Sequence, residues 1–272
     1  MSNEQRNQTG PILALDTSTA SMAAAIVSGH EVLADIQTLA ERNHSVHVVT
    51  HIQEMLRKSG LANTDIEAIA VGNGPGSYTG MRIAISVAKT LAWVWNKPLV
   101  SVSSLEAIAY GAWHQQVSGI AELDKARNGE HWVFPIMDAR RGQVYTSAFS
   151  MTDTSEWTRW LDDGVRIMKD FVDQLEQRLA NLPAGSIRSI SLVGDLSLHE
   201  ESAMHLKQIG EAAGVIVQLQ TFIQEGKWIA ELGLKRLQSG LLEDPHTLIP
   251  NYTQLTEAEV VWKAKQAGEA KA

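Results

Sequence analysis

The chain has 272 residues, a formal net charge of −8 and no cysteine. A chain of this length buries enough apolar surface to fold without disulfides or metals. The missing cysteines exclude disulfide frameworks, thiolate zinc sites and cysteine nucleophiles. A protein that grips RNA or DNA unaided needs a basic footprint, and no run of lysine or arginine supplies one here. Any role with nucleic acid is therefore expected to be shared with a more basic partner.

The N-terminal region predicts neither export nor membrane insertion. Residues 1–10 are polar and indicate a loose tail rather than a signal peptide. The apolar stretch 11–25 is interrupted by Asp16 and the three hydroxyl residues after it, and it is too short to span a bilayer. We therefore expect a cytoplasmic protein without membrane contact, in agreement with the absence of cysteine.

The first half of the chain predicts three short strands and then alternating helices and strands. Apolar runs at 12–15, 22–27 and 31–39, separated by polar turns, are typical of a strand meander. From Val46 the apolar residues recur every three or four positions, which predicts an amphipathic helix ending before Gly60. The next predicted elements are a strand at 66–71, a helix at 81–95, a strand at 99–102 and a helix at 104–114.

A polar segment with a glycine near each end, 118–130, is the expected linker between two lobes. After it the order of the first half returns in looser form. Strands alternating with helices imply mixed sheets with helices on their faces. We therefore predict an α/β protein of two lobes in the actin/hexokinase-like (ASKHA, ribonuclease H-like) arrangement, each lobe a mixed sheet flanked by helices. The later predicted elements are strands at 132–137, 144–149, 164–167, 187–193 and 215–219, and helices at 169–181, 200–213 and 225–238.

Asp16, Ser18 and Thr19 follow the first predicted strand directly. A carboxylate beside hydroxyls and backbone amides can orient a metal-bound phosphate or a water. Asx and Ser/Thr turns use the same residues. Taken alone, the pattern favours a turn.

Gly74, Gly76 and Gly80 stand within seven residues, together with Ser77 and Thr79, just ahead of a predicted helix. Such a loop lets the backbone approach a ligand, and the free amides at a helix start favour anions. No Lys-Ser or Lys-Thr pair follows the glycines, so this is not a P-loop. A strand-to-helix turn that needs positive φ angles is the alternative, and residue chemistry alone leaves both interpretations open.

Six segments of the chain form a recognisable series. They are residues 12–19 (ILALDTST), 43–47 (NHSVH), 74–82 (GPGSYTGMR), 102–109 (VSSLEAIA), 138–145 (DARRGQVY) and 249–262 (IPNYTQLTEAEVVW). In this order they resemble the bacterial TsaB family, formerly YeaZ. The resemblance is strong over 12–149 and weaker over 151–248, and GPGSYTGMR is its most specific element.

The resemblance implies a function in tRNA modification. The family is the non-catalytic dimerisation subunit of the machinery that makes threonylcarbamoyladenosine beside the tRNA anticodon. It binds the catalytic paralogue TsaD and helps to recruit the ATPase TsaE. The resemblance thus implies a scaffold that has no catalytic residues, reaches tRNA only through the complex, and forms a homodimer where TsaD is absent. It also implies actin-like lobes at 1–118 and 119–272, with the last helix and tail returning to the first lobe.

The catalytic paralogue indicates what this chain lacks. TsaD carries two histidines four residues apart on one helix, a spacing that lets both bind one metal. The matching positions here are Ser104 and Ile108, and neither side chain suits a metal. We therefore expect no metal site and no required cofactor, and we interpret Glu106 between them as a surface or helix-capping carboxylate.

The superfamily binds adenosine with a glycine turn from the second lobe. The nearest candidate here is 192–195, where one glycine precedes Asp195, whose carboxylate repels phosphate unless a cation intervenes. We therefore expect a weak or vestigial nucleotide site at most, formed by Asp16, Ser18, Thr19, Gly74, Gly76, Ser77, Thr79 and Gly80.

His44, His47 and His51 lie near one stripe of the first predicted helix. A histidine cluster needs geometry before it is called a metal site, and the pattern favours partly buried or interface histidines.

Arg140 and Arg141 stand in a predicted tight turn between two second-lobe strands. They are placed to contact a tRNA phosphate or a carboxylate of a partner protein. A solvated hairpin tip explains them equally well.

The partner surface implied by the family lies on the helices near 44–58 and 77–95. The second helix is apolar around most of its circumference, so it must be covered on both sides. Ile85→Glu or Val49→Glu is expected to abolish TsaD binding and leave the isolated chain folded. The predicted interface residues are Val46, Val49, Met55, Met81 and Ile85.

Three other functions stay open at this point. One is an active enzyme, either a glycoprotease or a TsaD-like transferase, and another is a sugar or acetate kinase of the same superfamily. The third is a scaffold unrelated to tRNA. The missing histidine pair argues against the first, and tight ATP binding would mark the second.

Overall fold

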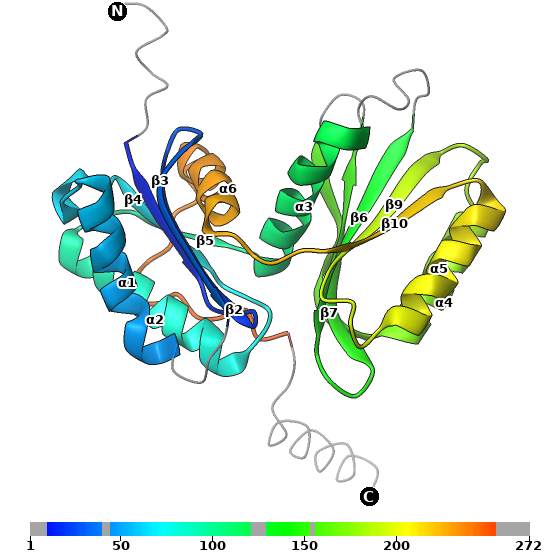
Figure 1. Ribbon diagram of the computed structural model, residues 1–272, viewed down its shortest axis with the longest axis horizontal. Helices are drawn as coiled ribbons and strands as arrows, with labels where there is room; N and C mark the ends of the chain where they lie inside the picture. Colours follow the sequence, from blue (N-terminus) through cyan, green and yellow to red (C-terminus); the bar gives the residue numbers. More distant parts are fainter. Residues whose placement is uncertain (1–9, 40–43, 121–128, 153–155, 254–272) are drawn as a thin grey trace, which may run out of the picture.

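The computed structural model describes residues 10–39, 44–120, 129–152 and 156–253. These residues form two lobes, each built on a five-stranded mixed sheet with helices on its faces (Figure 1). In both sheets the first strand of the lobe is central and pairs antiparallel with the second strand and parallel with the fourth. Counted within each lobe, both sheets have the strand order 3-2-1-4-5. The repeated topology confirms the predicted two-lobed actin/hexokinase-like fold.

The first lobe consists of β1 (Ile12–Asp16), β2 (Ser21–Ser28), β3 (Glu31–Leu39), α1 (His44–Ser59), a 3-10 turn (Asn63–Asp65), β4 (Ala68–Gly72), α2 (Tyr78–Trp95) and β5 (Leu99–Val102). Alternate side chains of β1 enter different cores, as expected for a strand covered on both faces. Leu13 and Leu15 face α1 and α2, whereas Ile12 and Ala14 face α6 (Gly226–Gln238). The last described helix of the chain thus packs on the sheet that the first strands of the chain form (Figure 1).

Close contact between α6 and the first sheet depends on small residues. A Cβ at Gly226 would collide with the backbone of Ala24 and Ala25, and one at Gly233 would press on the side chain of Ala70. Glycine at these two positions therefore lets the helix approach the strands more closely than a larger residue permits.

The second lobe consists of α3 (Ser104–Ile120), β6 (Glu130–Asp138), β7 (Gln143–Met151), β8 (Trp157–Ile167), α4 (Met168–Ala180), β9 (Ile187–Gly194), α5 (Glu200–Ala213) and β10 (Ile216–Thr221). We assign α3 to this lobe because it packs on the second sheet, although the expected boundary at 118/119 placed most of it in the first lobe. The helices α4 and α5 cover the outer face, where Phe134, Phe171 and Leu206 form a core. Helix α3 covers the inner face and also contacts α6. None of the described helices is long and apolar enough to cross a membrane.

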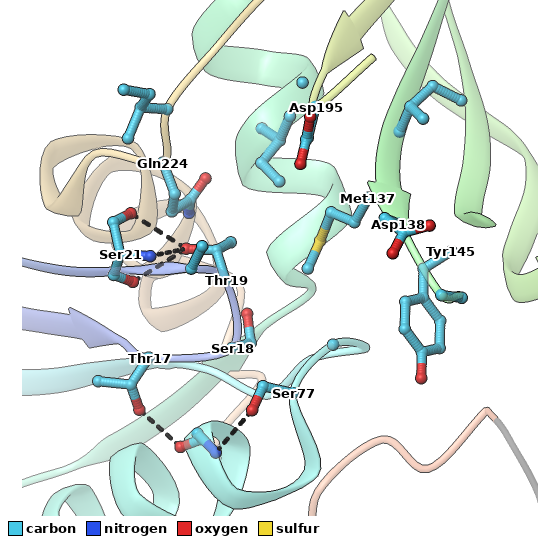
Figure 2. Close-up of a pocket in the computed structure, with 18 of the residues that line it drawn as sticks. Thr17, Ser18, Thr19, Ser21, Ser77, Met137, Asp138, Tyr145, Asp195 and Gln224 are labelled. Carbon is cyan, nitrogen blue, oxygen red and sulfur yellow. Dashed lines mark hydrogen bonds between the residues drawn. The ribbon is translucent and has the colours of Figure 1, made fainter. Parts of the chain in front are cut away.

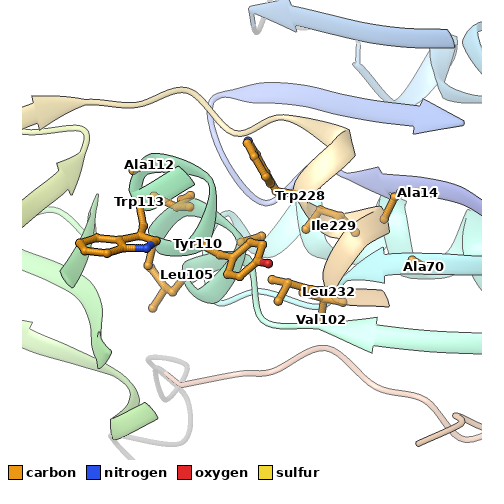
Figure 3. Close-up of a cluster of buried hydrophobic side chains, with 14 of the residues drawn as sticks. Ala14, Ala70, Val102, Leu105, Tyr110, Ala112, Trp113, Trp228, Ile229 and Leu232 are labelled. Carbon is orange, nitrogen blue, oxygen red and sulfur yellow. The ribbon is translucent and has the colours of Figure 1, made fainter. Parts of the chain in front are cut away.

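One apolar cluster joins the two lobes (Figure 3). Tyr110 of α3 packs edge-on against Trp228 of α6, with ring centroids 5.9 Å apart, and against Trp157 of β8 at 5.5 Å. Ala70 of the first sheet and Val133 of the second belong to the same cluster. The lobes are therefore fixed to each other through the buried pair α3 and α6.

The element boundaries differ from the sequence predictions at three places. Helix α3 continues to Ile120, so the predicted linker begins inside a helix, and its residues 121–128 lie outside the described residues. Strand β8 is longer than the predicted strand at 164–167, and the prediction fell short because irregular register with β7 obscures the alternation of apolar and polar residues along it. Helix α2 begins at Tyr78 because Ser77 accepts a hydrogen bond from the Gly80 amide and caps it. The predicted N-terminal tail is described only from Gly10.

Candidate functional site

A cleft of about 1130 Å³ lies between the two lobes (Figure 2). Its first-lobe wall is the turn between β1 and β2 together with the glycine loop before α2. Its second-lobe wall comes from the hairpin between β6 and β7 and from the segments after β9 and β10. The lining residues are 17–21, 76–80, Ile83, Ile108, 136–140, Tyr145, Gly194, Asp195 and 221–224.

The glycine loop is held against the turn after β1. The Ser77 amide donates to the Ser18 carbonyl (2.7 Å), and the Thr17 hydroxyl donates to the Gly80 carbonyl (2.6 Å). A Cβ at Gly80 would collide with the carbonyl oxygen of Thr17, so this position requires glycine for a close backbone approach. The Gly80 amide donates to the Ser77 hydroxyl (3.2 Å). Two amides that could otherwise bind an anion are therefore already occupied.

Asp16 lies beneath the cleft rather than in its lining. Its carboxylate is buried against Gly72, and Oδ1 accepts a hydrogen bond from the Ser18 amide (2.7 Å). Oδ2 has no partner of ordinary hydrogen-bond geometry among the described residues. Burial raises the pKa of Asp16, although hydrogen bonds from Ser104, Ser18 and Thr17 oppose the rise. The carboxylate is thus not presented to a ligand in the cleft.

The structure brings most of the predicted nucleotide-site residues together and leaves two out. Asp16 and Gly74 do not line the cleft, which corrects their predicted place in the site. The residues that do line it are Ser18, Thr19, Gly76, Ser77, Thr79 and Gly80.

Ser104 holds the glycine loop from below. Its hydroxyl accepts a hydrogen bond from the Gly74 amide (3.1 Å), and its own amide donates to the Gly74 carbonyl (2.9 Å). Ser104 is completely buried, and Ile108 one turn later lines the cleft. No group of three or more His, Cys, Asp or Glu side chains in the described part of the chain could hold a metal ion. The helix face that faces the cleft thus presents a structural hydroxyl and an apolar side chain.

The second-lobe wall carries two carboxylates that the sequence did not assign to one place. Asp138 Oδ1 lies 3.1 Å from His199 Nε2 and also accepts from the Arg140 amide (3.1 Å). Asp195 Oδ1 accepts from the Ser197 hydroxyl (2.7 Å). Arg140 is the one cationic residue in the described lining. Two carboxylates and one guanidinium disfavour a polyphosphate unless a cation accompanies it.

Arg140 and Arg141 occupy the tip of the hairpin between β6 and β7. Both have left-handed backbone conformations, with φ of 65° and 55°, which are uncommon for residues other than glycine, asparagine and aspartate. The Gln143 amide donates to the Arg140 carbonyl (3.0 Å) and closes the turn. The tip is exposed at the rim of the cleft. Both guanidinium groups are therefore carried on a defined turn near the second-lobe wall.

The helices of the predicted partner surface are only partly exposed. Val49 is 50% exposed, whereas Met55, Met81 and Ile85 are at most 3% exposed. Met55 and Ile85 face the first sheet, and Met81 packs on the glycine loop at Gly74. These three residues are buried and do not form a surface, which corrects the prediction, and Ile85→Glu is not expected to leave the chain folded. The side chain of Val46 lies outside the described residues. Three exposed residues of α2 that are not among the predicted interface residues are Tyr78, Trp93 and Val94.

The histidine stripe on α1 does not form a chelating group in the described residues. The rings of His47 and His51 have centroids 6.0 Å apart, and His51 Nδ1 lies 3.5 Å from the Met22 sulfur. The side chain of His44 lies outside the described residues. His51 is thus half-buried against the sheet, as predicted, whereas His47 is exposed, which corrects the expectation of partial burial for that residue.

Comparison with known proteins gives consistent matches. A family model described as "TsaD: tRNA N6-adenosine threonylcarbamoyltransferase" matches residues 35–262. The "tRNA threonylcarbamoyladenosine biosynthesis protein TsaB" of Bacillus subtilis (strain 168) is 31% identical over 258 residues, which cover 94% of this chain and 99% of that protein. The protein of the same name from Escherichia coli (strain K12) is 36% identical over 146 residues, 54% of this chain and 58% of that protein.

Two crystal structures from Pseudomonas aeruginosa are also similar. One is YeaZ (TM-score 0.64, 20% identity) and the other a protein similar to peptidase YeaZ (TM-score 0.67, 21% identity); each match covers 90% of this chain and 100% of that chain. At this identity the likeness concerns the fold alone. The match over almost the whole length of the Bacillus protein goes further: this chain belongs to the TsaB (YeaZ) family and shares the TsaD family model.

Proposed function

We propose that this chain is the non-catalytic dimerisation and scaffold subunit of the cytoplasmic complex that forms threonylcarbamoyladenosine on tRNA. In this proposal it binds and activates TsaD through α1 and α2, helps to recruit TsaE, and reaches tRNA only through the complex. The observation that carries the proposal is the pair Ser104 and Ile108. Where the TsaD resemblance implies metal-binding histidines, this chain has a hydroxyl hydrogen-bonded to Gly74 and an apolar side chain. Its relatives are named for the same biosynthesis.

The exposed apolar residues of α1 and α2 support a partner on these helices. Val49, Trp93 and Val94 are each at least 50% exposed. Trp93 and Val94 are adjacent in α2, and an exposed apolar surface of this kind is a candidate for partner binding. We infer that TsaD covers this face, and that a second copy of the chain covers it when TsaD is absent. A contact of Arg140 and Arg141 with a carboxylate of TsaE belongs to the same proposal.

A nucleotide is not a required part of the proposal. The cleft residues do not fit a polyphosphate well, because the amides of Ser77 and Gly80 are occupied and Asp138 and Asp195 oppose phosphate. We therefore infer weak nucleotide binding at most. Isothermal titration with ATP and magnesium tests this directly. Saturation at micromolar ATP would favour a kinase of the same superfamily instead.

Reconstitution tests the function as a whole. This chain, TsaD, TsaE and unmodified tRNA are combined with the threonylcarbamoyl donor, and modified adenosine is measured by mass spectrometry. Omitting the chain should stop modification, and adding it back should restore it. The chain without TsaD should give no product. Full modification in its absence, or stoichiometric metal and turnover in the isolated chain, would show that the scaffold assignment is wrong.

A further inference from the structure

An ionic network lies on the side of α3 that faces away from the cleft. Glu106 is two residues from both Ser104 and Ile108, and two residues turn a helix by about 200°. Its carboxylate binds Arg159 of β8 (3.1 Å) and Arg236 of α6 (3.3 Å). The Glu106 side chain is only 15% exposed. It is therefore not the surface or capping carboxylate that the sequence indicated, but a link between three elements.

Arg159 extends the network toward the edge of the second sheet. It pairs with Asp163 of the same strand, whose side chain is 8% exposed, and its guanidinium lies 4.7 Å from the centre of the Phe149 ring. Burial alone would lower the pKa of Arg159, but Asp163 and Glu106 outweigh it and raise the pKa above its ordinary value. Removing one partner of such a group leaves a poorly solvated charge behind. Glu106, Arg159 and Asp163 are therefore all needed to keep the charges of this network paired.

A C-terminal strap, residues 243–253, runs from α6 along the first lobe. The Glu243 amide donates to the Leu99 carbonyl (2.8 Å), and its carboxylate accepts from the Ser101 hydroxyl (2.5 Å). The Lys89 ammonium of α2 donates to the Leu248 carbonyl (2.8 Å). The strap is thus attached to both β5 and α2.

Asn251 joins the strap to the second lobe. Its backbone amide donates to the Asn73 carbonyl (2.9 Å), next to the glycine loop, and its side-chain amide donates to Asp163 (3.2 Å). The next residue, Tyr252, stacks on Tyr78 at the start of α2, with ring centroids 5.2 Å apart. Two consecutive residues, Asn251 and Tyr252, therefore connect β8, the segment before the glycine loop and the first turn of α2.

We propose that Asn251 and the Glu106–Arg159–Asp163 network form a brace that fixes the angle between the lobes and holds the start of α2 in place. The Glu106 end of the brace lies on the side of α3 opposite the cleft, and the Asn251 end reaches the segment that leads into the glycine loop of the cleft wall. Loss of the brace therefore lets the lobes hinge about the core of α3 and α6. The brace also couples the second lobe to α2, the helix to which the proposed function assigns TsaD. This inference depends only on the contacts within the chain.

Inter-lobe distance gives the test, and the absence of cysteine makes labelling simple. Asn63→Cys and Gln208→Cys place spin labels on exposed positions of the first and second lobes, and pulsed electron paramagnetic resonance measures their separation. Asn251→Asp sets a second carboxylate against Asp163, and Asn251→Ala only removes the donor. Lys58→Gln, which breaks an exposed ion pair with Glu54, is the control.

We expect one narrow distance distribution for the parent chain and for Lys58→Gln, and a broadened or shifted one for Asn251→Asp. In Asn251→Ala, amide exchange at Gly80 and Met81 should be about tenfold faster, since a hydrogen bond to a charged group contributes about 1.5 kcal/mol. If Asn251→Asp does not fold, Asn251→Ala decides by the same distance measurement. An unchanged distribution in the folded variants would overturn the proposal, as would exchange that accelerates equally throughout the chain.

Discussion

Val49 and Ile85 lie on neighbouring helices, and the same substitution should affect them in opposite ways. Ile85 is 3% exposed and packs in the first-lobe core, whereas Val49 is 50% exposed. Burying an isoleucine stabilises a fold by about 1.5–3 kcal/mol, and an unpaired buried carboxylate costs several kcal/mol more. Ile85→Glu should therefore lower the free energy of unfolding by roughly 5 kcal/mol or more, against a total of about 5–15 kcal/mol. Val49→Glu should lower it by about 1 kcal/mol or less, because the new carboxylate stays in water.

Two measurements separate these effects. Urea unfolding of the isolated chains, followed by tryptophan fluorescence, gives the change in stability, and co-elution with TsaD in size exclusion gives partner binding. Val49→Glu should unfold near the parent midpoint and fail to co-elute, whereas Ile85→Glu should be unfolded or nearly so without urea. Gln208→Glu, which adds the same charge at an exposed position of α5 in the second lobe, should match the parent in both assays. Normal co-elution of Val49→Glu would refute the interface, and parent-like stability of Ile85→Glu would refute the core assignment.

Three further predictions concern the framework of the cleft. In urea unfolding, Gly226→Ala should lower the free energy of unfolding by about 3 kcal/mol or more, because the new Cβ meets the strand backbone. The control Gly240→Ala places its Cβ in open space, so only the positive φ should lower the free energy of unfolding, by about 1 kcal/mol. Ser104→Ala should lower the free energy of unfolding by about 1–3 kcal/mol in the same assay, since it leaves the buried Gly74 amide without its acceptor. Because the pKa of Asp16 is raised in the folded chain, the folded chain holds this proton at pH values above 3.8, where the unfolded chain has lost it. The contribution of Asp16 to stability therefore falls as the pH rises from 3.8 through the pKa of the folded chain. Asp16→Asn should remove that fall when unfolding is measured from about pH 4 upward, and an unchanged pH profile would contradict the cause assigned to it.

Much of the fold could be predicted from short stretches of sequence. The apolar run at 12–15 and the alternation after it predict strands, because each side-chain periodicity follows from local backbone geometry. The loop from Gly74 to Gly80 was recognisable because close backbone approach and a helix start both restrict residue type. The family resemblance also depended on such local segments. It did not depend on where each predicted helix or strand begins and ends, so errors of a few residues in those boundaries did not affect it.

Periodicity did not reveal which stripe of an apolar helix faces the sheet. Met55 and Ile85 satisfy the pattern for a surface that binds a partner as well as the pattern for a core, and only packing against the first sheet assigned them to the core. Likewise, Asp16 follows a strand as a ligand-binding carboxylate would, but the approach of Gly72 directs it away from the cleft. Both outcomes depend on neighbours that are distant in sequence.

The brace shows this limit most clearly. Glu106, Arg159 and Asn251 are separated by 53 and 92 residues, and each by itself resembles an ordinary polar surface residue. Glu106 meets Arg159 because α3 packs on the inner face of the second sheet, and Asn251 reaches Asp163 because the strap returns to the first lobe. The sequence by itself thus determined the elements, the family and the missing histidine pair. Only the tertiary structure decided which polar groups share a site, since their contacts are set by packing and not by local periodicity.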